Sequence, residues 1–159
     1  MDRKISACLY KVMGILAAEI VTLHEKGGNM KKNTIMRCDS CGLTVETVSD
    51  QGCTQCVICC TEPMEELEAK TADTKVEKHV PFPVEGENGL IVKIGENVLH
   101  PMTEAHHIEW IEIIDGTKVY REYLKEGMVP EAFFPVKPVP GMILREYCNI
   151  HGLWEKTIG

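Results

Sequence analysis

The feature that most constrains the fold is a series of short β-prone runs in the second half of the chain, separated by turn residues. The runs are rich in Val, Ile, Tyr and Phe, which favour strands, and no convincing helix interrupts them. They cover residues 89–95, 108–114, 118–124, 132–136, 142–147 and 153–158. Gly116 follows Asp115 between two of them, and glycine tolerates the positive φ of a tight hairpin. The pattern predicts an antiparallel β-sandwich.

Cysteine and histidine side chains gather at the ends of these runs. Cys148 and His151 stand three residues apart at a strand-to-turn junction. Five of the six histidines follow residue 78, at this junction and in two further loops. One such histidine alone would be interpreted as a surface or core residue, but three clusters, one joined to a lone cysteine, indicate a metal site. Thiolate with imidazole suits iron, copper or zinc rather than magnesium or calcium.

The stretches around these clusters resemble the catalytic iron site of superoxide reductases, the desulfoferrodoxin and neelaredoxin family. The resemblance is carried by Glu77, Lys78, His79, Val80 and Pro81, by His100, Pro101, Met102 and His106, and by Cys148, Asn149, His151, Gly152, Leu153 and Trp154. It implies an immunoglobulin-like catalytic sandwich over residues 70–159.

The resemblance also implies the ligands of one non-haem iron. Four equatorial nitrogens and one axial sulfur would come from His79, His100, His106, His151 and Cys148. The sixth position would stay open to substrate.

Three neighbouring residues receive roles from the same resemblance. Glu77 matches the residue that closes the open position in the oxidised state, and Lys78 matches the one that attracts superoxide and assists protonation. His107 stands where relatives often have an aromatic residue, so we do not count it as a ligand. The implied activity is one-electron reduction of superoxide to hydrogen peroxide without release of dioxygen. An external donor, typically rubredoxin, would re-reduce the iron.

The first half of the chain holds most of the eight cysteines. Their spacing indicates metal ligation in a reducing compartment rather than a secreted disulfide framework, since two Cys-x-x-Cys elements complete a tetrahedral sulfur site. The candidates are Cys38 and Cys41, Cys53 and Cys56, and the vicinal pair Cys59 and Cys60.

Cys38, Cys41, Cys59 and Cys60, with Pro63 and Met64 after the vicinal pair, resemble desulforedoxin, the small iron module fused to superoxide reductase in desulfoferrodoxins. By that resemblance these four cysteines bind a second iron, with zinc as the alternative metal. The 17 residues between Cys41 and Cys59 exceed the usual spacing and contain another pair. A rubredoxin-like set of Cys38, Cys41, Cys53 and Cys56 therefore remains open.

These assignments divide the chain into residues 1–29, 30–69 and 70–159. Apolar residues at near-helical spacing predict an amphipathic helix over residues 1–25. The codons of residues 26–30 can resemble a ribosome-binding site, so Met30 is an alternative start. Residues 65–76 are charge-rich without strand alternation, and we expect a linker there.

A net charge of −7 and the lack of a marked basic patch disfavour a nucleic-acid-binding protein. No apolar run is long enough to span a bilayer, so we expect a cytoplasmic protein that does not associate with membranes. Relatives that carry the desulforedoxin-like module are commonly dimers, which favours a homodimer. Two other functions remain open: an iron electron-transfer or storage protein, and a zinc-stabilised β-sandwich binding module.

Overall fold

The structure is a computed structural model that describes residues 30–49, 57–72 and 78–159. The chain divides into two compact units, Met1–Leu67 and Glu68–Gly159. The helix expected over residues 1–25 lies outside the described residues, as do Cys53, Cys56 and Glu77. None of the described residues forms a helix with the length and apolar character needed to cross a membrane.

The described part of the first unit consists of very short strands. A three-stranded antiparallel sheet has the order β2-β1-β5, and a separate hairpin pairs β3 with β4. The bounds are β1 Ile35–Arg37, β2 Thr44–Glu46, β3 Ile58–Cys59, β4 Glu62–Pro63 and β5 Glu65–Glu66. Met36, Cys38 and Met64 form a small buried cluster.

Strand β5 corrects the expectation that a linker begins at residue 65. Glu65 and Glu66 pair with Arg37 and Met36 of β1. A two-residue strand is too short to show alternation, and its pairing depends on a partner strand distant in sequence, so the local pattern could not reveal it.

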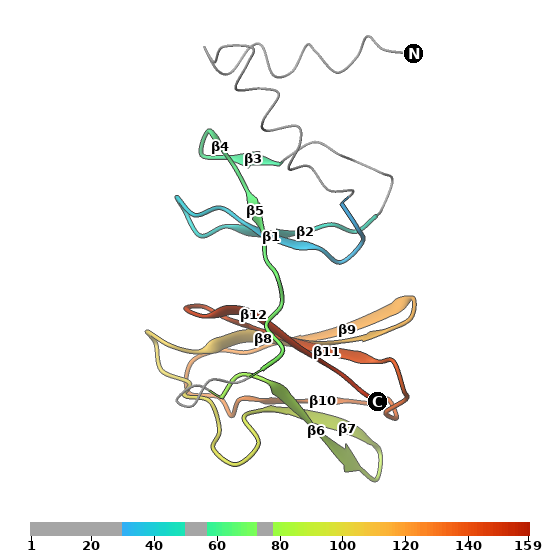
Figure 1. Cartoon of the computed structure of the whole chain (residues 1–159). Coiled ribbons are helices and arrows are strands. Elements are labelled where there is room, and N and C mark those ends of the chain that lie inside the picture. Colours follow the sequence, from blue (N-terminus) through green and yellow to red (C-terminus); the bar gives the residue numbers. More distant parts are fainter. Residues whose placement is uncertain (1–29, 50–56, 73–77) are drawn as a thin grey trace, which may run out of the picture. The chain divides into compact units, whose positions relative to one another are not determined.

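The second unit is an antiparallel sandwich of two sheets, which Figure 1 shows as β10-β7-β6 and β12-β11-β8-β9. The first sheet contains β6 Pro81–Gly86, β7 Gly89–Ile94 and β10 Glu131–Phe134. The second contains β8 Ile108–Asp115, β9 Lys118–Tyr123, β11 Ile143–Cys148 and β12 Gly152–Thr157.

The core of the second unit lies between these sheets, because alternate residues of each strand point inward. The inward side chains include Leu90 and Val92 from β7, Ile111 and Ile113 from β8, and Leu144 from β11, all fully buried. The predicted β-sandwich is thus confirmed, and the six predicted runs match strands with ends shifted by at most two residues.

Strand β6 was not predicted, because Pro81 and Pro83 disfavour a strand. It pairs only with β7 and therefore lies at the edge of its sheet. The two prolines occupy alternate positions, so their missing N–H groups fall on the same side of the strand. An edge strand tolerates this because that side needs no partner.

A β-bulge shifts the pairing register of β8 and β11 beside the loop that carries His106. Tyr147 of β11 pairs with Trp110, whereas the next residue, Cys148, pairs with Ile108, so Glu109 is the extra residue. The bulge reverses the alternation of β8 at this point and turns Ile108 into the core, where it is fully buried.

Candidate metal centres

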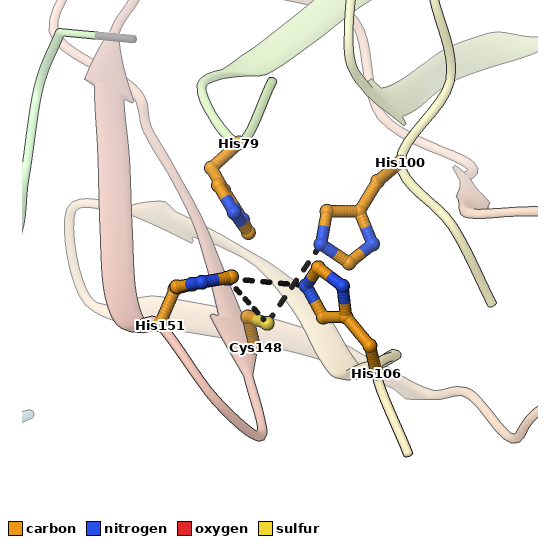
Figure 2. A group of neighbouring side chains, drawn as sticks. All are labelled: His79, His100, His106, Cys148 and His151. Carbon is orange, nitrogen blue, oxygen red and sulfur yellow. Dashed lines mark hydrogen bonds between the residues drawn. The ribbon is translucent and has the colours of Figure 1, made fainter. Parts of the chain in front are cut away.

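One end of the sandwich brings together five donor side chains, drawn in Figure 2. Each comes from the end of a strand or from an adjoining loop, where a rigid sheet can position it. His79 precedes β6, His100 follows β7, His106 precedes β8, Cys148 ends β11, and His151 lies in the turn before β12. Their ligand atoms lie within 4.8 Å of one another, and we call this group the histidine–cysteine site.

Hydrogen bonds on the outer side of two rings decide which nitrogen faces the centre. The Nδ1–H of His100 donates to the carbonyl of Pro101 at 2.6 Å, and the Nδ1–H of His79 donates to Oε1 of Glu146 at 3.2 Å. A carbonyl or carboxylate oxygen can only accept, so these nitrogens carry the proton. The Nε2 atoms of His79 and His100 keep their lone pairs for a metal.

The atoms that face the centre crowd one another. Nε2 of His106 lies 3.1 Å from Nδ1 of His151, and the sulfur of Cys148 lies 3.6 Å from that Nδ1 and 3.7 Å from Nε2 of His100. Cys148 is fully buried. Four imidazoles and a thiolate directed at one point form a donor set that a cation such as iron would satisfy, so the residues fit the metal.

Burial keeps two of these imidazoles neutral. Desolvation lowers the pKa of His79 to about 3 and that of His100 to about 4, and the neighbouring histidines act in the same direction. A neutral imidazole is the form that binds a metal, so both ligands are available at neutral pH without losing a proton.

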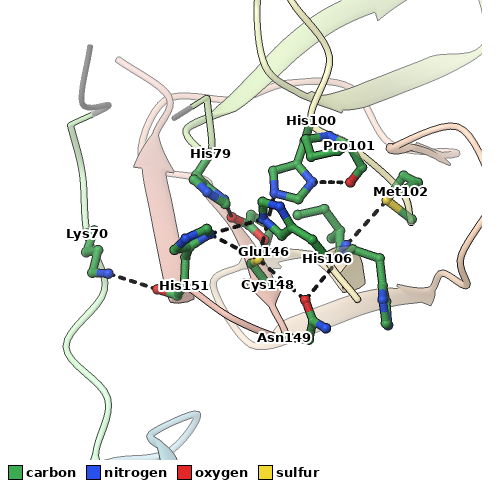
Figure 3. A network of polar contacts seen from close by, with 12 residues as sticks. Lys70, His79, His100, Pro101, Met102, His106, Glu146, Cys148, Asn149 and His151 are labelled. Atoms are coloured by element: carbon green, nitrogen blue, oxygen red, sulfur yellow. Dashed lines mark hydrogen bonds and ion pairs between the residues drawn. The ribbon is translucent and has the colours of Figure 1, made fainter. Parts of the chain in front are cut away.

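Asn149 joins two loops of the site (Figure 3). Its Oδ1 accepts a hydrogen bond from the backbone N–H of His107 at 3.0 Å, and its Nδ2 donates to the carbonyl of Ala105 at 3.1 Å. Its own backbone N–H donates to the carbonyl of His107 at 3.2 Å. These three bonds hold the loop of His106 against the turn that carries His151.

Glu146 and Asn149 were not predicted as site residues. The signal for Glu146 was its position two residues before Cys148, since strand alternation places the two on the same face. A carboxylate on the core face of a strand needs a buried partner, and that partner is His79. Asn149 was recognised only as part of a motif, because its partners come from a loop more than 40 residues earlier.

The other predicted site residues have different outcomes. Lys78 is among the residues that the structure describes. It is half-buried and directly precedes the fully buried His79 in the sequence. Glu77 lies outside the described residues. His107 stands apart from the five donors, and its Nδ1 lies 3.1 Å from the carbonyl oxygen of Thr103.

The first unit brings together Cys38, Cys41, Cys59 and Cys60, with their sulfurs within 4.8 Å of one another. We call this the four-cysteine site. The sulfurs of Cys41 and Cys59 are 3.6 Å apart, and Cys38 is buried. The rival set needs Cys53 and Cys56, which the structure does not describe.

The thiols of this site strongly influence one another. The backbone N–H of Leu43, and then the neighbouring thiols, lower the pKa of Cys41 to about 7. The thiols of Cys38 and Cys41 raise the pKa of Cys59 to about 12. Four thiolates at this separation repel one another unless a cation lies between them, and a tetrahedral sulfur set suits iron or zinc.

Comparisons with known proteins indicate the family to which the chain belongs. The family described as desulfoferrodoxin matches residues 71–157. A desulfoferrodoxin homolog of Methanothermobacter thermautotrophicus is 52% identical over 122 residues, covering 77% of this chain and 96% of that protein. A protein named superoxide reductase from Pyrococcus abyssi is 36% identical over 106 residues, covering 56% of this chain and 92% of that protein.

The fold has a match among solved structures. The crystal structure of the superoxide reductase from Treponema pallidum aligns with a TM-score of 0.61 at 23% identity, over 81% of this chain and 99% of that one. At this identity the likeness shows a shared fold. Together with the family match and the 52% identical relative, the two clusters lead to one conclusion: this chain belongs to the desulfoferrodoxin family.

Proposed function

We propose that this protein is a superoxide reductase that converts superoxide, one electron and two protons into hydrogen peroxide and releases no dioxygen. The observation that supports this most is the convergence of His79, His100, His106, His151 and Cys148 within 4.8 Å at one end of the sandwich. The relatives named superoxide reductase add to that support.

Bound ferrous iron would supply the electron. The protein supplies the ligands of the iron and the hydrogen bonds that orient them. Cys148 offers a buried thiolate, whose electron donation favours reduction of a bound oxidant. Glu146 and the carbonyl of Pro101 orient His79 and His100. Outer hydrogen bonds of this kind raise the basicity of ligands and hold them in place.

Two further residues act on the substrate in this proposal. Lys78 attracts the superoxide anion and, with water, delivers the protons. Glu77 would be a further ligand of the iron in its oxidised state. We expect Lys78→Ala to slow the encounter with superoxide and weaken its salt dependence, and Glu77→Ala to change the absorption spectrum of the oxidised site while reduction stays fast.

The proposal includes an external donor such as rubredoxin, since each turnover consumes one electron. The four-cysteine site could hold a second electron without being essential. The proposal also places the protein in the cytoplasm, because free thiols in such a cluster persist in a reducing compartment. It includes a homodimer on the resemblance to the desulforedoxin-like module alone.

The test is the yield of hydrogen peroxide per superoxide consumed by the anaerobically reduced protein, with dioxygen followed in the same sample. One peroxide per superoxide and no dioxygen is the expected result, and Cys148→Ser should abolish it. Half a peroxide per superoxide with dioxygen released would indicate a dismutase. No reaction above background would indicate an electron carrier instead.

A further inference from the structure

Lys70 is fixed to the sandwich by its backbone. It forms a parallel bridge with Trp154 of β12, the edge strand of the larger sheet. Its N–H donates to the carbonyl of Leu153 at 3.0 Å, and its carbonyl accepts from the N–H of Glu155 at 2.9 Å. The side chain therefore starts from a fixed point beside the histidine–cysteine site.

The Lys70 side chain then reaches toward that site, as Figure 3 shows. Its ammonium donates to the backbone carbonyl of His151 at 2.8 Å and lies 5.1 Å from the centre of the Trp154 ring. That ring in turn stacks on His79, with ring centres 4.6 Å apart and planes inclined by 15°. Two contacts thus restrain a long side chain that would otherwise be mobile in solvent.

The contacts of Lys70 place its charge close to the site. The carbonyl that accepts its hydrogen bond belongs to His151, one of the five donor residues, and the Trp154 ring packs on His79, another donor. A positive charge held there favours an approaching anion. The protein as a whole carries a formal charge of −7, so a small anion needs such a local field within a Debye length of the site.

We propose that Lys70 supplies a fixed positive charge at the rim of the histidine–cysteine site that draws small anions to it. This role of Lys70 adds to that of Lys78. The proposal rests on the proposed function only in taking superoxide as the anion. Lys70 lies one residue before the stretch that matches the family, residues 71–157.

Three substitutions separate the charge of Lys70 from its hydrogen bond. Lys70→Arg keeps both, Lys70→Gln keeps a donor without the charge, and Lys70→Met removes both. Lys118→Gln is the matched control, because Lys118 is an exposed lysine at the β8–β9 hairpin. That hairpin is at the opposite end of the eight-residue strand β8, more than about 20 Å from the site.

The first readout is the affinity of azide for the iron-loaded, oxidised protein, followed by absorption. At low salt we expect Lys70→Gln and Lys70→Met to weaken azide binding by about two- to fivefold, while Lys70→Arg and Lys118→Gln bind as the wild type does. The difference should largely disappear at about 0.5 M salt, where exposed charges are screened. Equal affinity of Lys70→Gln and wild type would overturn the proposal, because the charge of Lys70 would then have no effect on anion binding.

The second readout is the rate of superoxide consumption by the reduced variants after pulse radiolysis. We expect the rates of the variants to follow the same order as their azide affinities. The differences between these rates should also largely disappear at about 0.5 M salt. If the azide pattern holds but the wild type consumes no superoxide, the proposed function fails and the anion-attracting role of Lys70 stands. If superoxide is reduced and all variants react at equal rates, the role of Lys70 is contradicted and the proposed function stands.

Discussion

Oε1 of Glu146 lies 3.2 Å from Nδ1 of His79, and both side chains are fully buried at the wall of the histidine–cysteine site. The pair joins β11 to the segment before β6, and so links the two sheets of the sandwich at the site. Because the carboxylate can only accept, it holds the proton of His79 on the outer nitrogen and leaves Nε2 for the metal.

Glu146→Ala should weaken iron binding at this site by about ten- to a hundredfold, since removing such a partner lets the ligand ring rotate and change tautomer. Glu146→Gln should cost less, because its amide oxygen can still accept from His79. The measurement is iron retention against a chelator. Glu122→Ala, which removes an exposed carboxylate from the same sheet, is the control. Equal retention in Glu146→Ala and Glu122→Ala would contradict the assignment.

Gly95→Ala should both destabilise the sandwich and disturb the site. Gly95 has a φ of 93°, and an added Cβ would lie 2.1 Å from the carbonyl oxygen of Val98. The turn it forms leads directly to His100, whose N–H donates to the carbonyl of Ile94 at 2.9 Å. We expect a loss of at least about 2 kcal/mol in the free energy of unfolding, together with weaker iron binding.

The matched control for this turn is Gly116→Ala, since Gly116 has a φ of 56° but open space around it. It should cost only the conformational penalty of about 1 kcal/mol and leave iron binding unchanged. Urea unfolding and chelator competition measure the two effects. An equal loss of stability in both variants would mean that the clash at Val98 is relieved without disturbing the turn.

Thr61→Gly should stabilise the first unit by about 1 kcal/mol. Cys60 and Thr61 form the turn between β3 and β4 with φ values of 52° and 68°, and a β-branched residue is strained in this region. Thr44→Gly, in strand β2, is the opposite control and should destabilise the unit. Denaturation of the metal-free protein measures both, and a lower stability for Thr61→Gly would show that the turn tolerates threonine.

The metal-free protein should lose stability as the pH falls below about 6.5. His79 and His100 have pKa values lowered to about 3 and about 4 in the folded state, so the unfolded chain binds their protons first. Each histidine then contributes a loss of up to about 1.4 kcal/mol per pH unit until its folded pKa is reached. Urea unfolding at several pH values measures the slope, and His100→Gln should reduce it. A stability that does not change between pH 6.5 and 4.5 would contradict this origin.

The sequence was sufficient for those parts of the fold that depend on local pattern. Alternation and turn residues predicted six strands of the sandwich, because a strand with one buried face tends to have an apolar residue at every second position. The local pattern did not predict β6, because Pro81 and Pro83 are unfavourable in a strand that is not at an edge. It did not predict β5 either, because that two-residue strand is defined by its pairing with β1. The bulge at Glu109 also left no local signal, since it is a mismatch between two strands.

At the site, the sequence by itself indicated a metal through clusters of cysteine and histidine, and its resemblance to a known family implied the five donors that the structure brings together. Tertiary structure alone decided which nitrogen of His79 and His100 faces the centre, since that depends on Glu146 and the carbonyl of Pro101. It also decided that Lys70, an exposed lysine in a stretch expected to be a linker, reaches the rim of the site. Contacts between residues far apart in the chain are set by the packing of both sheets, and no local pattern encodes them.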